Sequence, residues 1–387
     1  MEKFTSWFCL NERSNFTINP QITPQDSQYY FGRDDIKKQL QKQIRRSFTA
    51  PGVPKLMVWG PYGSGKTQTL FYLKHFLETE KPEFVESTPR IIYLTIELRD
   101  NSSASDFHMQ LMEQLGKETV TEWVKKLFER ERDFESVMRT ISDNDENTMN
   151  ALKELRVNGD SALIAWRWLT GQKIPDQQLS TLNLTRNIGV NTAQDLVQVL
   201  VAIGALASMV GEMLVFMIDE LEQLLGVRTG NASESIHSYV RYLADPSNPS
   251  VGFLIGFKAD VLDDAPEVLR RGDIHDRIGA ANYIDIPPLP AVADVKTFII
   301  ELLKHLTKND EVELKISEKG LDSEVGVFPF SRPALELLAD YATQDPSRAL
   351  PRNIIHAINE CAIEAWDEGK AVIDEIIVNS VAPHVFQ

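Results

Sequence analysis

The sequence has little cysteine and no long hydrophobic segment, and each absence excludes a class of protein. Its 387 residues include two cysteines, Cys9 and Cys361, which are too few for a disulfide framework and show no metal-ligand spacing. No apolar run reaches the length of a membrane span, and Met1-Glu2-Lys3 does not open a secretory signal. We therefore expect a cytoplasmic protein with no membrane partner.

Positive charge is also scarce. The formal net charge is -16 at pH 7, which disfavours a general nucleic-acid coat because phosphate binding is driven by Lys and Arg. A local basic groove stays compatible with this charge. One expected helix carries Lys37, Lys38, Lys42, Arg45 and Arg46. This run is more typical of a solvated face than of a phosphate-binding one, so nucleic acid is only weakly indicated as a partner.

What the sequence does contain is a complete phosphate-loop motif. Residues 60 to 67 fit G-x-x-x-x-G-K-[ST], between the apolar run 56–59 and an amphipathic helical pattern. Glycines let the loop N–H groups face phosphate oxygens, and the next helix presents its positive N-terminus. Lys66 then reaches the β and γ phosphates, and the Thr67 hydroxyl ligates Mg²⁺. The predicted ATP contacts are Gly60, Pro61, Tyr62, Gly63, Ser64, Gly65, Lys66, Thr67 and Gln68.

A second apolar run, residues 213–218, ends in Asp219 and Glu220. An unbroken apolar run is typical of a strand that is buried on both faces of a parallel sheet. Together with the phosphate loop it predicts a Walker B strand. Asp219 then holds Mg²⁺, directly or through water, and Glu220 polarises the attacking water. The two acids could instead begin a helix as its cap, which is the less favoured interpretation.

The patterns along the chain predict three segments. These are an N-terminal arm 1–28, an α/β core 29–290 with a helical insertion at about 101–210, and a helical domain 291–387. Within the core, helical patterns alternate with apolar runs, which include 91–98, 251–257 and 283–286 and predict a parallel sheet. The arm is expected to pack along a partner or on its own core. The densest apolar face of the insertion is expected at Leu163, Ile164, Trp166, Trp168 and Leu169.

The order of these motifs resembles the AAA+ ATPases, in the branch of origin-recognition initiators and STAND signalling ATPases. The resemblance covers about residues 29–380 and rests on Phe31-Gly32-Arg33-Asp34, the two Walker motifs, the strand near Gly256, Arg277 before Tyr283, and Pro351-Arg352-Asn353. It implies an α/β P-loop NTPase (AAA+) fold, with a parallel-sheet core and a C-terminal helical lid, and it places Gly32 and Arg33 beside the adenine. The chain departs from the family at Gly256-Phe257-Lys258, where a polar first sensor is usual. This departure puts fast turnover in doubt.

The resemblance also implies roles for two arginines. Arg352 matches the second sensor of the lid, which touches the γ phosphate, with Arg348 as the alternative. Arg277 matches an arginine that reaches the nucleotide of a neighbouring subunit, with Arg270 and Arg271 next. A fixed guanidinium can neutralise charge on the transferring phosphoryl group. For Arg277, an ordinary surface ion pair is an equally good interpretation.

A narrower resemblance lies in the insertion. Trp166-Arg167-Trp168-Leu169-Thr170-Gly171 and Asn187-Ile188-Gly189-Val190 look like the ATP-binding proteins of bacterial phage-defence loci such as the BREX type. Core packing explains the tryptophans as well. The resemblances imply an ATP-hydrolysing switch or motor that assembles as a homo-oligomer and acts with protein partners, in antiviral defence. The alternative is a slowly hydrolysing scaffold that locks an effector assembly. We expect no winged-helix domain before the chain ends at Gln387.

Overall fold

The protein divides into two compact units, each built from segments that are distant in sequence. The structure, a computed structural model, describes residues 3–11, 13–48, 52–80, 87–99, 102–143, 145–157, 159–188, 193–226 and 231–386. The first unit comprises residues 1–40, 60–75 and 285–387, and the second comprises 41–59 and 76–284. The phosphate loop is thus grouped with the C-terminal helices. The segment boundaries expected from the sequence stay a prediction.

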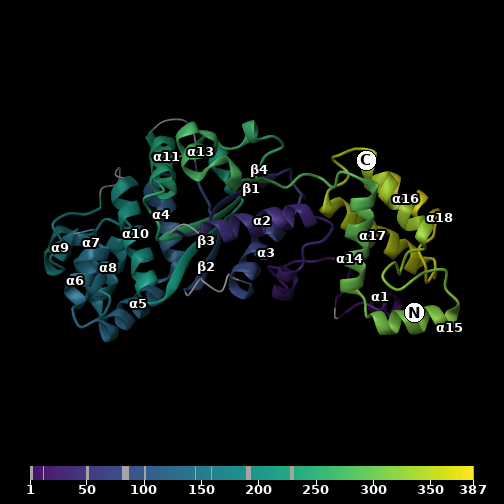
Figure 1. Ribbon diagram of the computed structural model, residues 1–387, viewed down its shortest axis with the longest axis horizontal. Coiled ribbons are helices and arrows are strands. Elements are labelled where there is room, and N and C mark those ends of the chain that lie inside the picture. The colour runs from purple at the N-terminus through teal and green to yellow at the C-terminus, as the bar shows by residue number, and fades with distance from the viewer. Residues whose placement is uncertain are drawn as a thin grey trace. The chain divides into compact units, whose positions relative to one another are not determined.

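The second unit contains a five-stranded sheet in the order β2-β3-β4-β1-β5, of which Figure 1 labels the first four strands of the chain, β1 to β4. The strands are β1 (Lys55–Gly60), β2 (Thr88–Thr95), β3 (Glu212–Asp219), β4 (Val251–Lys258) and β5 (Tyr283–Asp285). β3 pairs in parallel with both β2 and β4, and all its residues are buried. The predicted class, an α/β P-loop fold with a parallel sheet, is confirmed.

One strand was placed incorrectly by the sequence pattern. The strand expected at 91–98 begins at Thr88 and ends at Thr95. Pairing with β3 sets these limits, because Thr88 lies opposite Glu212 and Thr95 lies opposite Asp219. Hydrophobicity continues to Leu98, but the ladder does not. The remaining apolar runs coincide with strands to within two residues.

Helices surround this sheet and fill the long segment between β2 and β3. They are α4 (Ala104–Leu115), α5 (Lys117–Arg130), α6 (Phe134–Ile141), α7 (Glu146–Glu154), α8 (Asp160–Leu169), α9 (Asp176–Thr181), α10 (Ala193–Met209), α11 (Asn231–Ala244), α12 (Glu267–Arg270) and α13 (Gly272–Ile278). Short 3₁₀ turns are η2 (Leu221–Gly226), η3 (Leu262–Asp264) and η4 (Ala280–Asn282). α10 contacts β3, α4, α5 and α11 and is the central helix of this core.

The apolar face expected on α8 is only partly right. Trp168 and Leu169 are buried, but Leu163 is 51% exposed, and Ile164 and Trp166 are partly buried. Because α8 is amphipathic and packs against α7, one of its faces stays in solvent. Figure 1 shows α6, α7, α8 and α9 grouped within this unit.

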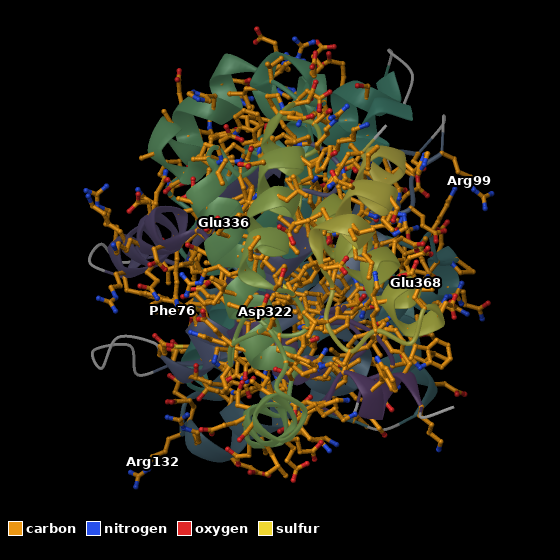
Figure 2. All side chains as sticks on the ribbon, turned by 90° about the vertical axis from the view of Figure 1, so that its right-hand side faces the viewer. Phe76, Arg99, Arg132, Asp322, Glu336 and Glu368 are labelled. Carbon is orange, nitrogen blue, oxygen red and sulfur yellow. The ribbon has the colours of Figure 1, made fainter. Side chains whose placement is uncertain are left out.

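The first unit has its own hydrophobic core, built by its helices. They are α1 (Phe4–Trp7), the 3₁₀ turn η1 (Pro24–Gln28), α14 (Val292–Leu306), α15 (Asn309–Lys319), α16 (Arg332–Thr343), α17 (Pro351–Asp367) and α18 (Glu375–Val385). Two further helices, α2 (Asp34–Ser47) and α3 (Lys66–Thr79), have residues in both units. Figure 2 shows the described side chains as sticks, and its labels include three exposed acids of this unit, Asp322, Glu336 and Glu368.

The N-terminal arm belongs to this core. Phe8 and Phe16 are fully buried, and the Phe4 ring contacts the Trp366 ring edge-on at 6.0 Å. Of the two arrangements open from the sequence, the structure shows packing on the arm's own chain.

No helix in the described ranges is long and apolar enough to cross a membrane.

Candidate nucleotide-binding site

The phosphate loop connects β1 to α3 and depends on three glycines with positive φ. These are Gly60 (φ 155°), Gly63 (φ 84°) and Gly65 (φ 96°). A Cβ atom at Gly60 would stand 2.5 Å from the carbonyl oxygen of Ile286, whereas one at Gly65 would meet no atom within 4 Å. The backbone is therefore tightly packed at Gly60 and open at Gly65, beside the N-terminus of α3. Open space beside the N-terminus of a helix is suited to an anion.

We expect Gly60→Ala to lower the free energy of unfolding by about 1–3 kcal/mol, the usual cost of overpacking. The added methyl group would collide with the Ile286 carbonyl oxygen, 2.5 Å away. Urea unfolding measures the change. The matched control is Gly272→Ala, at a position without positive φ where an added Cβ meets nothing within 4 Å. Equal losses in the two variants would contradict the assignment of Gly60 as a steric requirement.

The polar groups of the loop are placed for phosphate oxygens. The Lys66 ammonium donates to the carbonyls of Gly60 and Pro61, at 3.1 and 2.9 Å. The Ser64 hydroxyl is fully buried and has no hydrogen-bond partner among the described residues. A buried hydroxyl without a partner is unfavourable, and a phosphate oxygen would satisfy it. The loop therefore fits the phosphates of a nucleotide.

Gln68 makes contacts that the motif does not indicate. Its amide nitrogen donates to the carbonyls of Asp26 and Tyr29, at 2.7 and 2.6 Å. Its amide oxygen is buried without a partner among the described residues. Gln68 thus links α3 to the N-terminal arm, and its contact with a nucleotide stays a prediction.

The opening box, Gly32 and Arg33, is held against the helical part of the same unit. Gly32 has φ 64°, its N–H donates to Glu301 at 2.8 Å, and an added Cβ would stand 2.8 Å from that of Phe298. The Arg33 guanidinium is buried and donates to the Pro287 carbonyl at 2.6 Å. Burial lowers the pKa of Arg33, against the opposing influence of Tyr30 and Asp285. Their position beside an adenine stays a prediction.

The structure brings Arg352 to the phosphate loop. Its backbone N–H donates to the Gly63 carbonyl at 3.3 Å, and its guanidinium lies 4.5 Å from the centre of the Tyr62 ring. Its Cβ lies 3.1 Å from the place of a Cβ at Gly63. The alternative, Arg348, lies in the turn between α16 and α17 and donates to the Gln344 side chain at 3.2 Å. Geometry therefore favours Arg352 as the arginine of the lid.

The Walker B residues end β3. Asp219 is 2% exposed, and Glu220 is exposed with φ 57°. The Glu220 N–H donates to the Asp219 carboxylate at 3.0 Å, and the chain then enters η2. The preceding run forms β3, and η2 begins directly after Glu220, so the catalytic role of the two acids stays a prediction beside the cap interpretation. A left-handed backbone at a residue other than glycine is uncommon and often marks a functional position. No sequence signal indicates it.

The three candidate finger arginines differ in their contacts. Arg277 donates to Asp245 at 3.4 Å and to the carbonyl of Asp273 at 2.6 Å. Arg271 donates to Glu234 at 3.0 Å. Arg270 ends α12, is exposed, and makes no ion pair or hydrogen bond from its side chain among the residues that the structure describes. Arg277 and Arg271 are therefore engaged within their own unit.

Part of the basic run on α2 is also engaged. Lys37 lies over the Tyr72 ring at 5.5 Å, Arg45 lies over the Phe76 ring at 5.8 Å, and Lys38 pairs with Asp35 at 3.8 Å. These contacts favour the interpretation of a solvated helix face.

Within the described ranges, no three His, Cys, Asp or Glu side chains are grouped as a metal site. Mg²⁺ with a nucleotide usually needs only one or two protein oxygens, because phosphates and water supply the others. Thr67 and Asp219 stay the predicted protein ligands, because their oxygens are of the kind that Mg²⁺ prefers.

Comparison with known proteins supports the fold. No protein-family model matches the sequence, and no curated protein matches it. The solved ORC2 protein of Aeropyrum pernix, in its ADPNP-ADP complexes, matches with TM-score 0.54 at 15% identity over 97% of this chain and 72% of that chain. Cdc6p of Pyrobaculum aerophilum matches with TM-score 0.48 at 13% identity, over 92% of this chain and 68% of that chain. The likeness to ORC2 concerns architecture alone, and the chain has the P-loop AAA+ fold of that protein.

Proposed function

We propose that this protein binds ATP on its phosphate loop and hydrolyses it as a switch or motor. The observation that carries the proposal is the packing of Arg352 on Gly63 of a loop that holds a lysine and a buried hydroxyl without a partner among the described residues. One solved structure of the same fold is described as ADPNP and ADP complexes, which supports a nucleotide as the ligand.

In this proposal, the loop N–H groups, Ser64 and Lys66 hold the phosphates. Thr67 and Asp219 would hold Mg²⁺, which supplies positive charge to the phosphates when it is bound. The exposed Glu220 takes a proton from the attacking water. Its place at the end of β3 supports this role, because β4 alone separates β3 from β1, which leads into the loop, and carboxyl ends of parallel strands share one edge of a sheet.

We further propose that the protein assembles as a homo-oligomer and that Arg270, rather than Arg277, reaches the neighbouring nucleotide. Arg270 is exposed and has no side-chain partner in the described ranges, whereas Arg277 is held by Asp245 and by the Asp273 carbonyl. Moving Arg277 would break contacts that Arg270 does not have.

Mixing variants tests this assignment. We expect Arg270→Ala to bind ATP normally and to lose about 100-fold or more in hydrolysis, as for other transition-state arginines. Adding Lys66→Ala subunits should restore part of the activity, since the mixture pairs an intact site with an intact arginine. Arg277→Ala is the matched comparison and should lose thermal stability instead. Rescue of Arg277→Ala alone, without rescue of Arg270→Ala, would return the role to Arg277.

A slowly hydrolysing scaffold is the second candidate function, and β4 favours it. This strand ends in buried Phe257 and exposed Lys258, so no Asn or Thr is present to position water at its end. ATP would then lock a conformation for a protein partner.

Equilibrium binding of a labelled ATP analogue, followed by turnover with and without DNA, tests the proposal. Binding with steady hydrolysis supports the switch or motor, and stimulation by DNA would add nucleic acid to its partners. Tight retention of ATP with negligible turnover supports the scaffold. An absence of binding at millimolar ATP would contradict both candidate functions, the switch or motor and the scaffold.

A role in antiviral defence, in a multi-protein system, is the most specific part of the proposal. It is supported by the sequence resemblance at 166–171 and 187–190 alone, of which Gly189 and Val190 lie outside the described residues. Trp168 is buried and donates to the Arg186 carbonyl at 2.9 Å, so it has a structural role in any case.

A further inference from the structure

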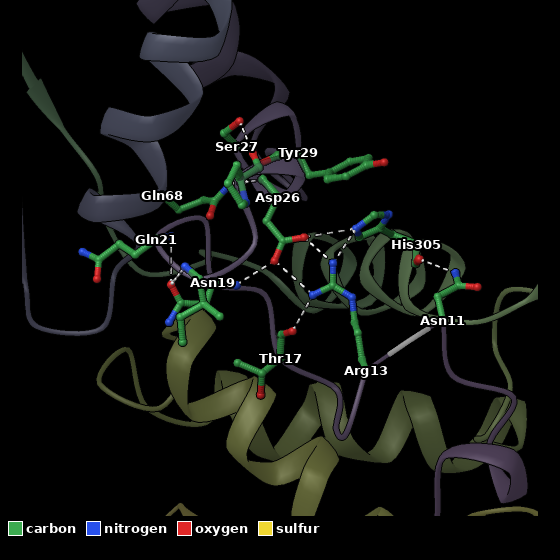
Figure 3. A network of polar contacts seen from close by, with 12 residues as sticks. Asn11, Arg13, Thr17, Asn19, Gln21, Asp26, Ser27, Tyr29, Gln68 and His305 are labelled. Atoms are coloured by element: carbon green, nitrogen blue, oxygen red, sulfur yellow. Dashed lines mark hydrogen bonds and ion pairs between the residues drawn. The ribbon is translucent and has the colours of Figure 1, made fainter. Parts of the chain in front are cut away.

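A carboxylate that the proposed chemistry does not use lies at the centre of a buried polar cluster in the first unit. Asp26, in η1, is fully buried (Figure 3). The Arg13 guanidinium donates hydrogen bonds to both carboxylate oxygens of Asp26, one of them at 3.0 Å. The Asn19 N–H donates to the same carboxylate at 2.8 Å. His305 of α14 lies 3.5 Å away. We call these four residues the Asp26 cluster.

The cluster is an ion pair at neutral pH. Burial raises the pKa of Asp26, but the hydrogen bonds from His305, Arg13 and Asn19 outweigh this effect and hold the pKa at about 2. Since a buried charge without its partner is strongly unfavourable, the arm is fixed at Asp26 as long as Arg13 is present. The Tyr29 ring also packs on the His305 ring, with centroids 3.6 Å apart.

The same turn of chain holds the start of α3. The backbone carbonyls of Asp26 and Tyr29 accept both hydrogen bonds of the Gln68 amide nitrogen, at 2.7 and 2.6 Å. Tyr30 and Thr69 share a hydrogen bond of 2.9 Å between their hydroxyls. Gln68 and Thr69 directly follow Lys66 and Thr67 of the phosphate loop. Figure 3 shows Gln68 directed toward this turn, on the opposite side of Asp26 from Thr17.

We propose that the arm, through the Asp26 cluster, positions the first turn of α3 for phosphate binding. Asp26 and Arg13 are positioning residues, because they act on the nucleotide only through Gln68 and Thr69. The inference rests on the proposed nucleotide site. It adds that the affinity of this site for nucleotide depends on the N-terminal arm, which lies outside the phosphate-loop motif.

The test compares Asp26→Asn with two controls. We expect Asp26→Asn to weaken the binding of a fluorescent ADP analogue about three- to tenfold, which lies in the lower part of the range of coupling seen between contacting residues. Amide hydrogen exchange of residues 63–70 should become faster in the nucleotide-free variant. Asp322→Asn, an exposed aspartate of the same unit, should change neither measurement.

A second control separates positioning from general destabilisation. Val378→Ala removes methyl groups from the fully buried face of α18 in the same core, and should lower Tm without changing ADP affinity. If Asp26→Asn does not fold, Arg13→Lys replaces it in the test. This change keeps the positive charge but loses the bidentate hydrogen bonds to Asp26, so it should weaken ADP binding less than is expected for Asp26→Asn.

Either of two results would overturn the inference. One is ADP affinity within twofold of wild type, with unchanged exchange, in folded Asp26→Asn. The other is an equal loss of affinity in Val378→Ala at a matched Tm. The exchange measurement needs no nucleotide, so it still tests the positioning role if wild type does not bind ADP, in which case the proposed function fails by itself.

Discussion

Glu220→Gln should bind ATP with nearly unchanged affinity and hydrolyse it about 100-fold more slowly or worse, the usual effect of losing a general base. Glutamine keeps the size of the side chain and much of its hydrogen bonding but cannot take a proton from water. The exposed position of Glu220 means that the substitution removes no buried contact. Single-turnover hydrolysis with excess protein isolates the chemical step from product release.

Asp219→Asn is the companion variant for the metal. Asp219 is 2% exposed and accepts the Glu220 N–H, so this change should shift the Mg²⁺ dependence of hydrolysis to higher concentration. A wild-type rate in Glu220→Gln would exclude Glu220 as the base. The scaffold function would then be favoured, because no other candidate for the base follows β3 in the sequence motif.

The strands and the phosphate loop could be predicted from the sequence because their signals are local. Residues 213–218 are apolar without interruption, and all of β3 is buried in the structure. The loop glycines are required by backbone conformation, since all three have positive φ. The hydrophobic pattern does not predict where a strand ends when the end is set by pairing with its neighbour. β2 therefore ends at Thr95, although the apolar run continues.

Contacts between distant residues could not be predicted in this way. The Asp26 cluster joins Arg13 to His305, and no periodicity links residues so far apart in the chain. The arm shows no helical or strand pattern because its aromatic residues fill gaps in the core of α14 and α17 rather than forming a regular face. No motif distinguishes Arg270 from Arg277, because the proposed preference depends on the contact between Arg277 and Asp245.

Lys66→Ala should lower the affinity for a labelled ATP analogue about tenfold or more, so that its binding curve shifts to higher analogue concentration than that of wild type. The ammonium is the one positive side chain within the loop motif, and charge-assisted bonds to phosphate are about twice as strong as neutral ones. In the structure this group already bonds the Gly60 and Pro61 carbonyls, at 3.1 and 2.9 Å, so it is held at the loop rather than in solvent. Equilibrium binding by fluorescence anisotropy measures the effect.

Lys74→Ala is the matched control, because Lys74 lies on the same helix but outside the motif. This variant should bind the analogue as wild type does. Thermal unfolding of both variants without nucleotide checks that α3 is intact. ATP should raise the Tm of wild type and of Lys74→Ala but not that of Lys66→Ala, since a ligand stabilises only a protein that binds it. Equal affinity in folded Lys66→Ala and in wild type would remove the phosphate loop from the proposed function, and Ser64 and the lid arginine would then need another ligand.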